Sequence, residues 1–253
     1  MDDEVYYLYA FTWSDCPADG LGPAVDPRFS VELATSGRLA ALVSRVGLDQ
    51  FDLSRLAGQN AADVEWLGQV AFRHNQIISQ AASKRPVLPL RIGTLFRSRA
   101  SLSARLEHCR PVVTDFLKRL GDRQEWAAKI YLDQAPSVAT AAAGSGKVYL
   151  LRKRQDEQAR RTAQEQGQRE AATVEAALAG QADLACRVRI LPANVTGRRE
   201  KMLLNAAYLV SRSASEPWLK LAERLGRAAA EKGLLLQVTG PWPPYHFCPE
   251  VNS

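Results

Sequence analysis

The order of strand-like and helix-like segments in the second half of the chain restricts the possible folds more than any other feature. The expected segments are a strand at 147–153 ("KVYLLRK"), a long polar helix over 155–179, strands at 184–191 and 203–211, a helix from about 216 to 231, and a strand at 234–238. This β-α-β-β-α-β order is that of ferredoxin-like domains, in which an antiparallel sheet carries two helices on one face. We therefore expect an α+β fold, with a ferredoxin-like C-terminal domain that contains one long helix.

The first half has the parts of a related α+β unit. Aromatic and β-branched residues predict a strand at 5–11 ("VYYLYAF"), and a loop rich in Pro, Gly and Asp leads to a second strand at 38–46. Apolar residues at helical spacing then predict an amphipathic helix from about residue 60 to residue 83, with Asn60 as its N-cap.

The rest of this half is an extended segment, a second helix and a strand. Residues 85–96 ("RPVLPLRIGTLF") are apolar, but two prolines restrict them to an edge strand or an extended segment. The helix that follows has Ser101 or Ser103 as its expected N-cap and Pro111 as an expected kink. A strand at 125–133 ("EWAAKIYLD") is expected to close the half.

A stretch of small residues without periodic hydrophobic positions, "QAPSVATAAAGSG" at 134–146, indicates a linker between two domains. We therefore expect an N-terminal α+β domain over residues 1–134, a linker over 135–146 and the ferredoxin-like domain over 147–253. No repeat at a fixed period relates the two halves.

Composition indicates a globular protein with no disulfide framework. The chain has 253 residues, 46% of them hydrophobic, which is enough for a core in one large or two small domains. Its apolar runs fall short of the roughly 20 residues of a membrane helix, and its acidic, then strand-like start is unlike a signal peptide, so we expect a cytoplasmic protein that does not bind membranes. The four cysteines, Cys16, Cys109, Cys186 and Cys248, form no C-x-x-C pair.

No sequence motif indicates a cofactor, a metal or a catalytic centre. "AAAGSGKV" at 141–148 resembles a phosphate-binding loop, but Lys147 is followed by Val148 rather than Ser or Thr, and by an expected strand rather than a helix. His108 beside Cys109 and His246 near Cys248 have no diagnostic metal-ligand spacing. A small-molecule enzyme on a ferredoxin-like scaffold remains an alternative, because catalytic groups converge only in the folded chain.

Charge leaves one further alternative open. The net charge is +6, and most of the 33 basic residues are arginine, which suits protein contacts as well as nucleic acid. A nucleic-acid-binding module is an alternative, but the basic run "LLRKRQDEQARR" is interrupted by Asp156 and Glu157, and we expect no nucleic-acid partner.

The long polar helix has only a narrow apolar stripe, and Gly167 weakens its middle. The stripe suits either a protruding arm or a helix that lies on the sheet with a solvated outer face. Its members are Ala159, Ala163, Ala171, Val174 and Ala177 or Leu178.

The segment "TGPWPPYHF" at 239–247 has neither a helical nor a strand period. Its prolines exclude a helix and favour a stiff, extended arm. Aromatic side chains on such an arm either lock the last strand against the second domain or contact a partner. The candidate partner-binding residues are Trp242, Pro243, Pro244, Tyr245 and Phe247.

This segment resembles the C-terminal signature of the GvpF/GvpL family of gas vesicle proteins, a G-P-W-P-P-Y-x-F string. Further blocks resemble that family in the same order, so that the resemblance covers nearly the whole chain. They are "YYLYAF", "VLPLRIGTLF", "EWAAKIY", "KVYLLRKR" and "MLLNAAYLVSR".

The resemblance implies a two-domain α+β protein without enzymatic activity that takes part in building gas vesicles. It implies the small hydrophobic shell protein GvpA and other accessory Gvp proteins as partners, and a location at the gas vesicle, on the gas-facing side of the shell. The aromatic segment and the Arg-rich surface would then serve to recognise an aggregation-prone subunit.

Overall fold

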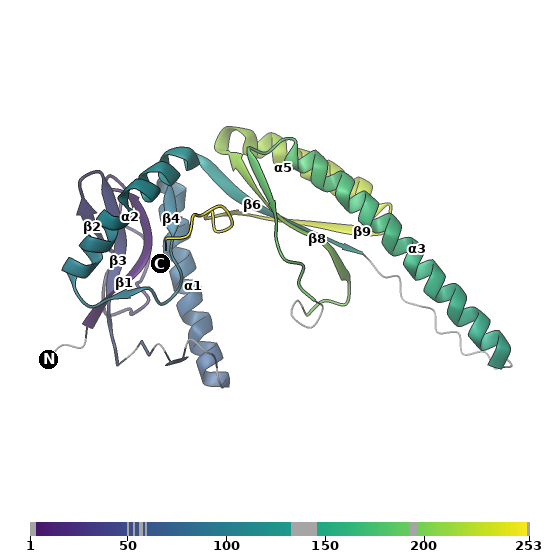
Figure 1. Cartoon of the computed structure of the whole chain (residues 1–253), viewed down its shortest axis with the longest axis horizontal. Coiled ribbons are helices and arrows are strands. Elements are labelled where there is room, and N and C mark those ends of the chain that lie inside the picture. The colour runs from purple at the N-terminus through teal and green to yellow at the C-terminus, as the bar shows by residue number, and fades with distance from the viewer. Residues whose placement is uncertain are drawn as a thin grey trace. The chain divides into compact units, whose positions relative to one another are not determined.

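The computed structural model describes residues 4–49, 51–52, 54–55, 58, 60–132, 146–192 and 197–251. Contacts between residues divide the chain into two units (Figure 1). The first unit comprises residues 1–123 together with 243–253, and the second comprises residues 124–242. The expected boundary at residues 134–146 is therefore displaced, and the first unit is built from two separate stretches of the chain.

The first unit contains a sheet with the order β2-β3-β1-β4, in which β5 also pairs with β1. Its strands are β1 (Glu4–Trp13), β2 (Glu32–Ser36), β3 (Leu39–Gly47), β4 (Val87–Pro89) and β5 (Leu95–Phe96). The expected strands at 5–11 and 38–46 are confirmed, and the proline-containing β4 lies at the edge of the main strand path as expected. Strand β2 was not expected from the sequence, and it joins β3 through a tight turn at Gly37, where φ is 57°.

Two helices cover opposite faces of this sheet. Tyr7 of β1 contacts α1 (Ala61–Lys84), whereas the next residue, Leu8, lines a hollow together with Arg105 of α2 (Arg99–Leu120). Since successive side chains of a strand point to opposite faces, the helices lie on either side of β1. This explains why Leu8, like Tyr7, is completely buried.

The N-cap of each helix can be compared with the residue expected from the sequence. Asn60 caps α1 as expected, because its side chain accepts a hydrogen bond from the backbone N–H of Asp63 at 2.9 Å. The expected caps of α2, Ser101 or Ser103, are wrong. Ser98 is the N-cap, and it forms a capping box with Ser101, so that the helix begins one turn earlier than expected. Pro111 lies inside the helix.

The second unit has the expected β-α-β-β-α-β order, but its first strand was assigned wrongly. Its elements are β6 (Arg123–Leu132), α3 (Gly146–Ala179), β7 (Leu184–Arg187), β8 (Lys201–Ser211), α5 (Arg212–Ala230) and β9 (Leu234–Trp242). The strand expected to close the first half is β6, which pairs with β9 and neighbours β8 in a sheet of order β7-β8-β6-β9. It therefore opens the second unit.

Residues 147–153, expected as a strand, belong to α3 instead. A short apolar run has the same composition in a buried strand and in a helix, so periodicity alone could not separate the two. The expected linker lies outside the described residues up to residue 145, and Gly146 already begins α3.

Helices α3 and α5 share a core with one face of the sheet. Ala171, Val174 and Leu178 of α3 are buried, and Leu178 accepts a hydrogen bond at 3.1 Å from the indole of Trp218 on α5. Only part of the expected apolar stripe is therefore buried, because Ala159 and Ala163 are exposed. Both readings of the helix hold in part, since its second half lies on the sheet and residues 153–163 are exposed.

Gly167 marks the point where α3 reaches the sheet. A Cβ atom there would lie 3.0 Å from a terminal methyl of Leu203 and 3.4 Å from methyl groups of Leu132 and Leu234. The glycine that weakens the helix in the sequence analysis thus permits the helix to approach the sheet closely.

The C-terminal segment is not the stiff, extended arm that its prolines indicate. Residues 239–242 continue β9, with Trp242 opposite Glu125 of β6, and residues 243–247 then form a tight turn in the first unit. Proline is tolerated at 241 because β9 lies at the edge of the sheet. Gly240 has φ 140° and packs against Trp126, which leaves no room for a side chain.

Candidate functional site at the C-terminal segment

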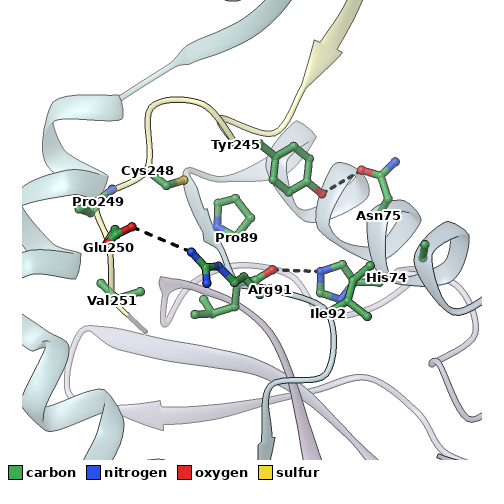
Figure 2. Close-up of a pocket in the computed structure, with 12 residues that line it drawn as sticks. His74, Asn75, Pro89, Arg91, Ile92, Tyr245, Cys248, Pro249, Glu250 and Val251 are labelled. Carbon is green, nitrogen blue, oxygen red and sulfur yellow. Dashed lines mark hydrogen bonds and ion pairs between the residues drawn. The ribbon is translucent and has the colours of Figure 1, made fainter. Parts of the chain in front are cut away.

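The C-terminal segment, residues 243–251, is attached to three parts of the first unit. The hydroxyl of Tyr245 donates a hydrogen bond to the side-chain oxygen of Asn75 on α1 at 2.9 Å (Figure 2). Glu250 faces Arg91, in the turn after β4, at 4.0 Å. Arg105 of α2 donates to the carbonyl oxygen of Val251, whose side chain is buried. The segment therefore bridges both helices of the unit.

A pocket of about 610 Å³ opens between this segment, α1 and the turn after β4 (Figure 2). Its wall is mainly apolar, and its polar groups stand at two ends, the Asn75–Tyr245 hydrogen bond at one and the Arg91–Glu250 pair at the other. The lining residues are Ala71, His74, Asn75, Pro89, Leu90, Arg91, Ile92, Tyr245, Cys248, Pro249, Glu250 and Val251. An apolar wall with few polar groups is typical of a site that accepts an apolar side chain or ligand.

His74, beneath the pocket, is buried and fully hydrogen-bonded. Its Nε2 lies 3.2 Å from the carbonyl oxygen of Leu90, so Nε2–H must be the donor, and Nδ1 then accepts from the hydroxyl of Tyr7 at 2.9 Å. Burial lowers the pKa of His74 to about 4 and raises that of Tyr7 far above its usual value. Both groups are therefore neutral at physiological pH, and neither imidazole nitrogen is available to a metal or as a base.

Of the five residues that the sequence analysis selected, Tyr245 lines the pocket. Its side chain is 39% exposed. Pro243 and Pro244 are buried and Phe247 is half-buried. Trp242 belongs to the second unit, is 40% exposed and donates to Thr239 Oγ1 at 3.2 Å. The structure thus divides the expected aromatic site between two units.

The sequence analysis missed the groups that complete the pocket, above all Asn75, Arg91 and Glu250. No local signal distinguishes them, because they meet only when residues 243–251 pack on the first unit.

A second group that the sequence did not indicate, the cluster around Asp26, has a structural role. Buried Asp26 would have a raised pKa from burial, but hydrogen bonds from Arg28 and from the N–H of Gly47 lower it below its usual value.

The geometry gives little support to a metal site, a phosphate-binding loop or a membrane helix. Among the residues that the structure describes, no group of three or more His, Cys, Asp or Glu side chains is arranged to hold a metal ion. A helix does follow Lys147, which removes one argument against a phosphate-binding loop, but Val148 still replaces the Ser or Thr, and residues 141–145 lie outside the described part. Within the described ranges, no helix is both long and apolar enough to cross a bilayer.

Comparison with known proteins shows which proteins the chain is similar to. The family model "Gas vesicle synthesis protein GvpL/GvpF" matches residues 5–249. Gas vesicle protein L of Streptomyces sp. (strain CB03234) is 31% identical over 258 residues, covering 97% of this chain and 93% of that protein. Gas vesicle protein F of the same strain is 24% identical, covering 95% of this chain and 98% of that protein.

Solved structures support the same fold. The crystal structure of GvpF from Anabaena sp. PCC7120 superposes with a TM-score of 0.70 at 17% identity, covering 98% of this chain and 97% of that one. GvpF from Microcystis aeruginosa gives 0.67 at 15% identity, covering 97% and 99%. The two-domain α+β architecture is therefore shared over the full length, and the chain belongs to the gas vesicle protein family GvpL/GvpF.

Proposed function

We propose that this gas vesicle protein is an accessory or minor structural component that binds the hydrophobic shell protein GvpA and supports assembly of the vesicle. The observation that carries the proposal is the family match over residues 5–249, which spans both units and most of the C-terminal segment. Its place of action is the gas vesicle within the cytoplasm, on the gas-facing side of the shell, and other accessory Gvp proteins are further partners.

The first candidate contacts are Tyr245, in the C-terminal segment, and Trp242, at the end of β9. Tyr245 and Trp242 each expose about two fifths of a large aromatic side chain, although both also make a hydrogen bond. Aromatic side chains that are partly exposed yet held in place lose little entropy on binding, and such residues are frequent anchors in protein interfaces. Pro243, Pro244 and Phe247 serve to fix the turn that holds Tyr245 at the pocket.

A binding role suits the pocket better than catalysis does. Catalysis by proton transfer requires a titratable group with a free position toward the substrate. Both nitrogens of His74 are occupied within the fold, and Tyr7 is kept protonated by burial. Arg91 and Glu250 face each other at the exposed rim. We therefore infer that this pocket binds rather than catalyses and, together with the family match, that the protein is not an enzyme and requires no cofactor.

Co-purification tests this proposal. Tagged protein is expressed together with GvpA, and wild type is compared with Trp242→Ala, Tyr245→Ala and the matched control Tyr149→Ala, which removes an exposed tyrosine from α3. We expect wild type and control to retain GvpA and Trp242→Ala and Tyr245→Ala each to lose most of it, with unchanged circular dichroism. Failure of the wild type to retain GvpA would refute the proposed function.

A further inference from the structure

The outer face of α1 carries an apolar row that no part of the described chain covers. Val64 is 58% exposed and Phe72 is 69% exposed, and Gly68 lies exposed between them. The three positions are spaced by four residues, so they form one stripe about 12 Å long. Exposed apolar rows of this kind indicate a contact with another molecule.

Gly68 is the most informative member of the row. It stands inside a 24-residue helix, where glycine lowers helix stability relative to alanine. A Cβ atom built at Gly68 meets no atom within 4 Å, so the fold of the chain does not require glycine at this position. A small residue in the middle of an exposed apolar row permits the backbone of a second helix to approach closely.

The row continues into the pocket described above. Ala71 lines the pocket and neighbours Phe72, and Asn75, one turn further, holds Tyr245. We call the surface formed by Val64, Gly68, Ala71, Phe72 and Tyr245 the α1 face. It combines an extended apolar stripe with a cavity at one end, a shape that accommodates a helix with one large apolar side chain inserted.

Charges on the α1 face are few and stand at its two ends. Glu65, beside Val64, makes no ion pair with another described residue, and the neighbouring Asp63 is engaged by Arg55 at 2.9 Å. At the pocket end, the Arg91 side chain is 75% exposed and lies 4.0 Å from Glu250, at the limit of an ion pair. On a chain with net charge +6, this face offers little to a polyanion. It is complementary to an apolar helix with a basic group near Glu65 and an acidic group near Arg91.

We propose that the α1 face is the docking site for an apolar helix of the hydrophobic shell subunit, packed across Gly68 with a large side chain in the pocket. This proposal rests on the proposed function and assigns it a surface. It adds helix α1 to the C-terminal segment as a contact surface, and the sequence did not indicate this role for the helix.

The experiment measures binding of GvpA by full-length wild type, Gly68→Gln, Phe72→Ser and the control Val112→Ser, which alters an exposed apolar residue on α2. Co-expressed GvpA is one probe, and fluorescent overlapping 20-residue GvpA peptides, each with a helix-breaking proline version, are the other. We expect Gly68→Gln and Phe72→Ser to weaken binding about tenfold or more while Val112→Ser binds like wild type. The peptide that binds should lose its affinity when proline is introduced.

The outcomes separate the two proposals. If wild type binds GvpA and the α1 variants bind equally well, the docking site is refuted and the proposed function stands. If wild type binds neither GvpA nor any peptide, the function is refuted as well. If analytical ultracentrifugation finds a dimer of wild type that Phe72→Ser dissociates, a second copy of the chain occupies the face and the shell-helix assignment is wrong.

Discussion

Two long helices of this protein, α1 and α3, each carry a glycine away from their ends, and the surroundings of the two glycines are opposite. Gly167 of α3 is pressed against leucine side chains of its own unit, whereas Gly68 of α1 faces open space. Packing within the chain therefore explains the glycine in α3 but not the glycine in α1. A glycine inside a helix therefore indicates a partner only where the packing of the chain itself does not require it.

The largest expected effect tests whether the sheet-bound half of α3 depends on its core. Trp218 packs against Trp126 and Tyr208, with ring centroids 6.1 and 5.4 Å away, and its indole hydrogen-bonds to Leu178. Trp218→Ala should lower the free energy of unfolding by about 3–5 kcal/mol, because it leaves a cavity beneath α3. Trp242→Ala, at a position that is 40% exposed, should lower it by only about 1 kcal/mol. Urea denaturation of both variants checks the contrast, and equal effects would contradict it.

The buried side of α1 should make stability depend on pH. Folding lowers the pKa of His74 from 6.5 to about 4, so its contribution is complete above pH 6.5 and is lost as the pH falls toward 4. The expected slope is about 1.4 kcal/mol per pH unit, reaching about 3 kcal/mol near pH 4. Urea titrations from pH 7 to 4.5 measure it, with His74→Gln as the control that should lose most of the slope. A wild-type curve that is flat over this range would show that His74 is not buried in neutral form.

A bulky residue at each glycine tests the comparison directly. Gly167→Leu should cost about 1–3 kcal/mol, since even its Cβ would lie 3.0 Å from Leu203 and the added side chain overpacks the core. Gly68→Leu should not lower the free energy of unfolding, because the position is open and leucine favours the helix. Thermal unfolding followed by circular dichroism compares the two variants. Equal destabilisation would show that the surroundings of the two glycines do not differ as described.

The sequence predicted the local elements better than their partners. Strand β1 and helix α1 with its cap at Asn60 follow from local patterns, and the structure confirms them. The β-α-β-β-α-β order is also present, but its first strand is β6 rather than residues 147–153. The assignment of β6 failed because membership of a sheet depends on β9, about a hundred residues further along the chain. Residues 147–153 were mistaken for a strand because a short apolar run has no decisive period.

The candidate site shows the same limit. Tyr245 could be selected from the sequence because the prolines beside it exclude a helix and leave its aromatic side chain to pack on the domain or on a partner. Asn75, Arg91 and Glu250 could not, because ordinary polar residues become part of a pocket only through the contact between two distant stretches of chain. The α1 row was equally hidden, since the amphipathic period of the helix does not reveal that Val64 and Phe72 lie on its outer side.

The smallest expected effect carries the most weight for the docking site. Gly68→Ala should raise the free energy of unfolding by about 0.5–1 kcal/mol, because alanine favours the helix and its methyl group meets no other atom. For a chain of this size, that corresponds to a rise in Tm of about 1–4 °C, which differential scanning calorimetry can measure. Gly167→Ala is the matched control. It gains the same helix propensity but must displace Leu203, so its net change should be smaller or negative. If Gly68→Ala destabilised the protein, the glycine would have a role within the fold and would no longer indicate a partner helix.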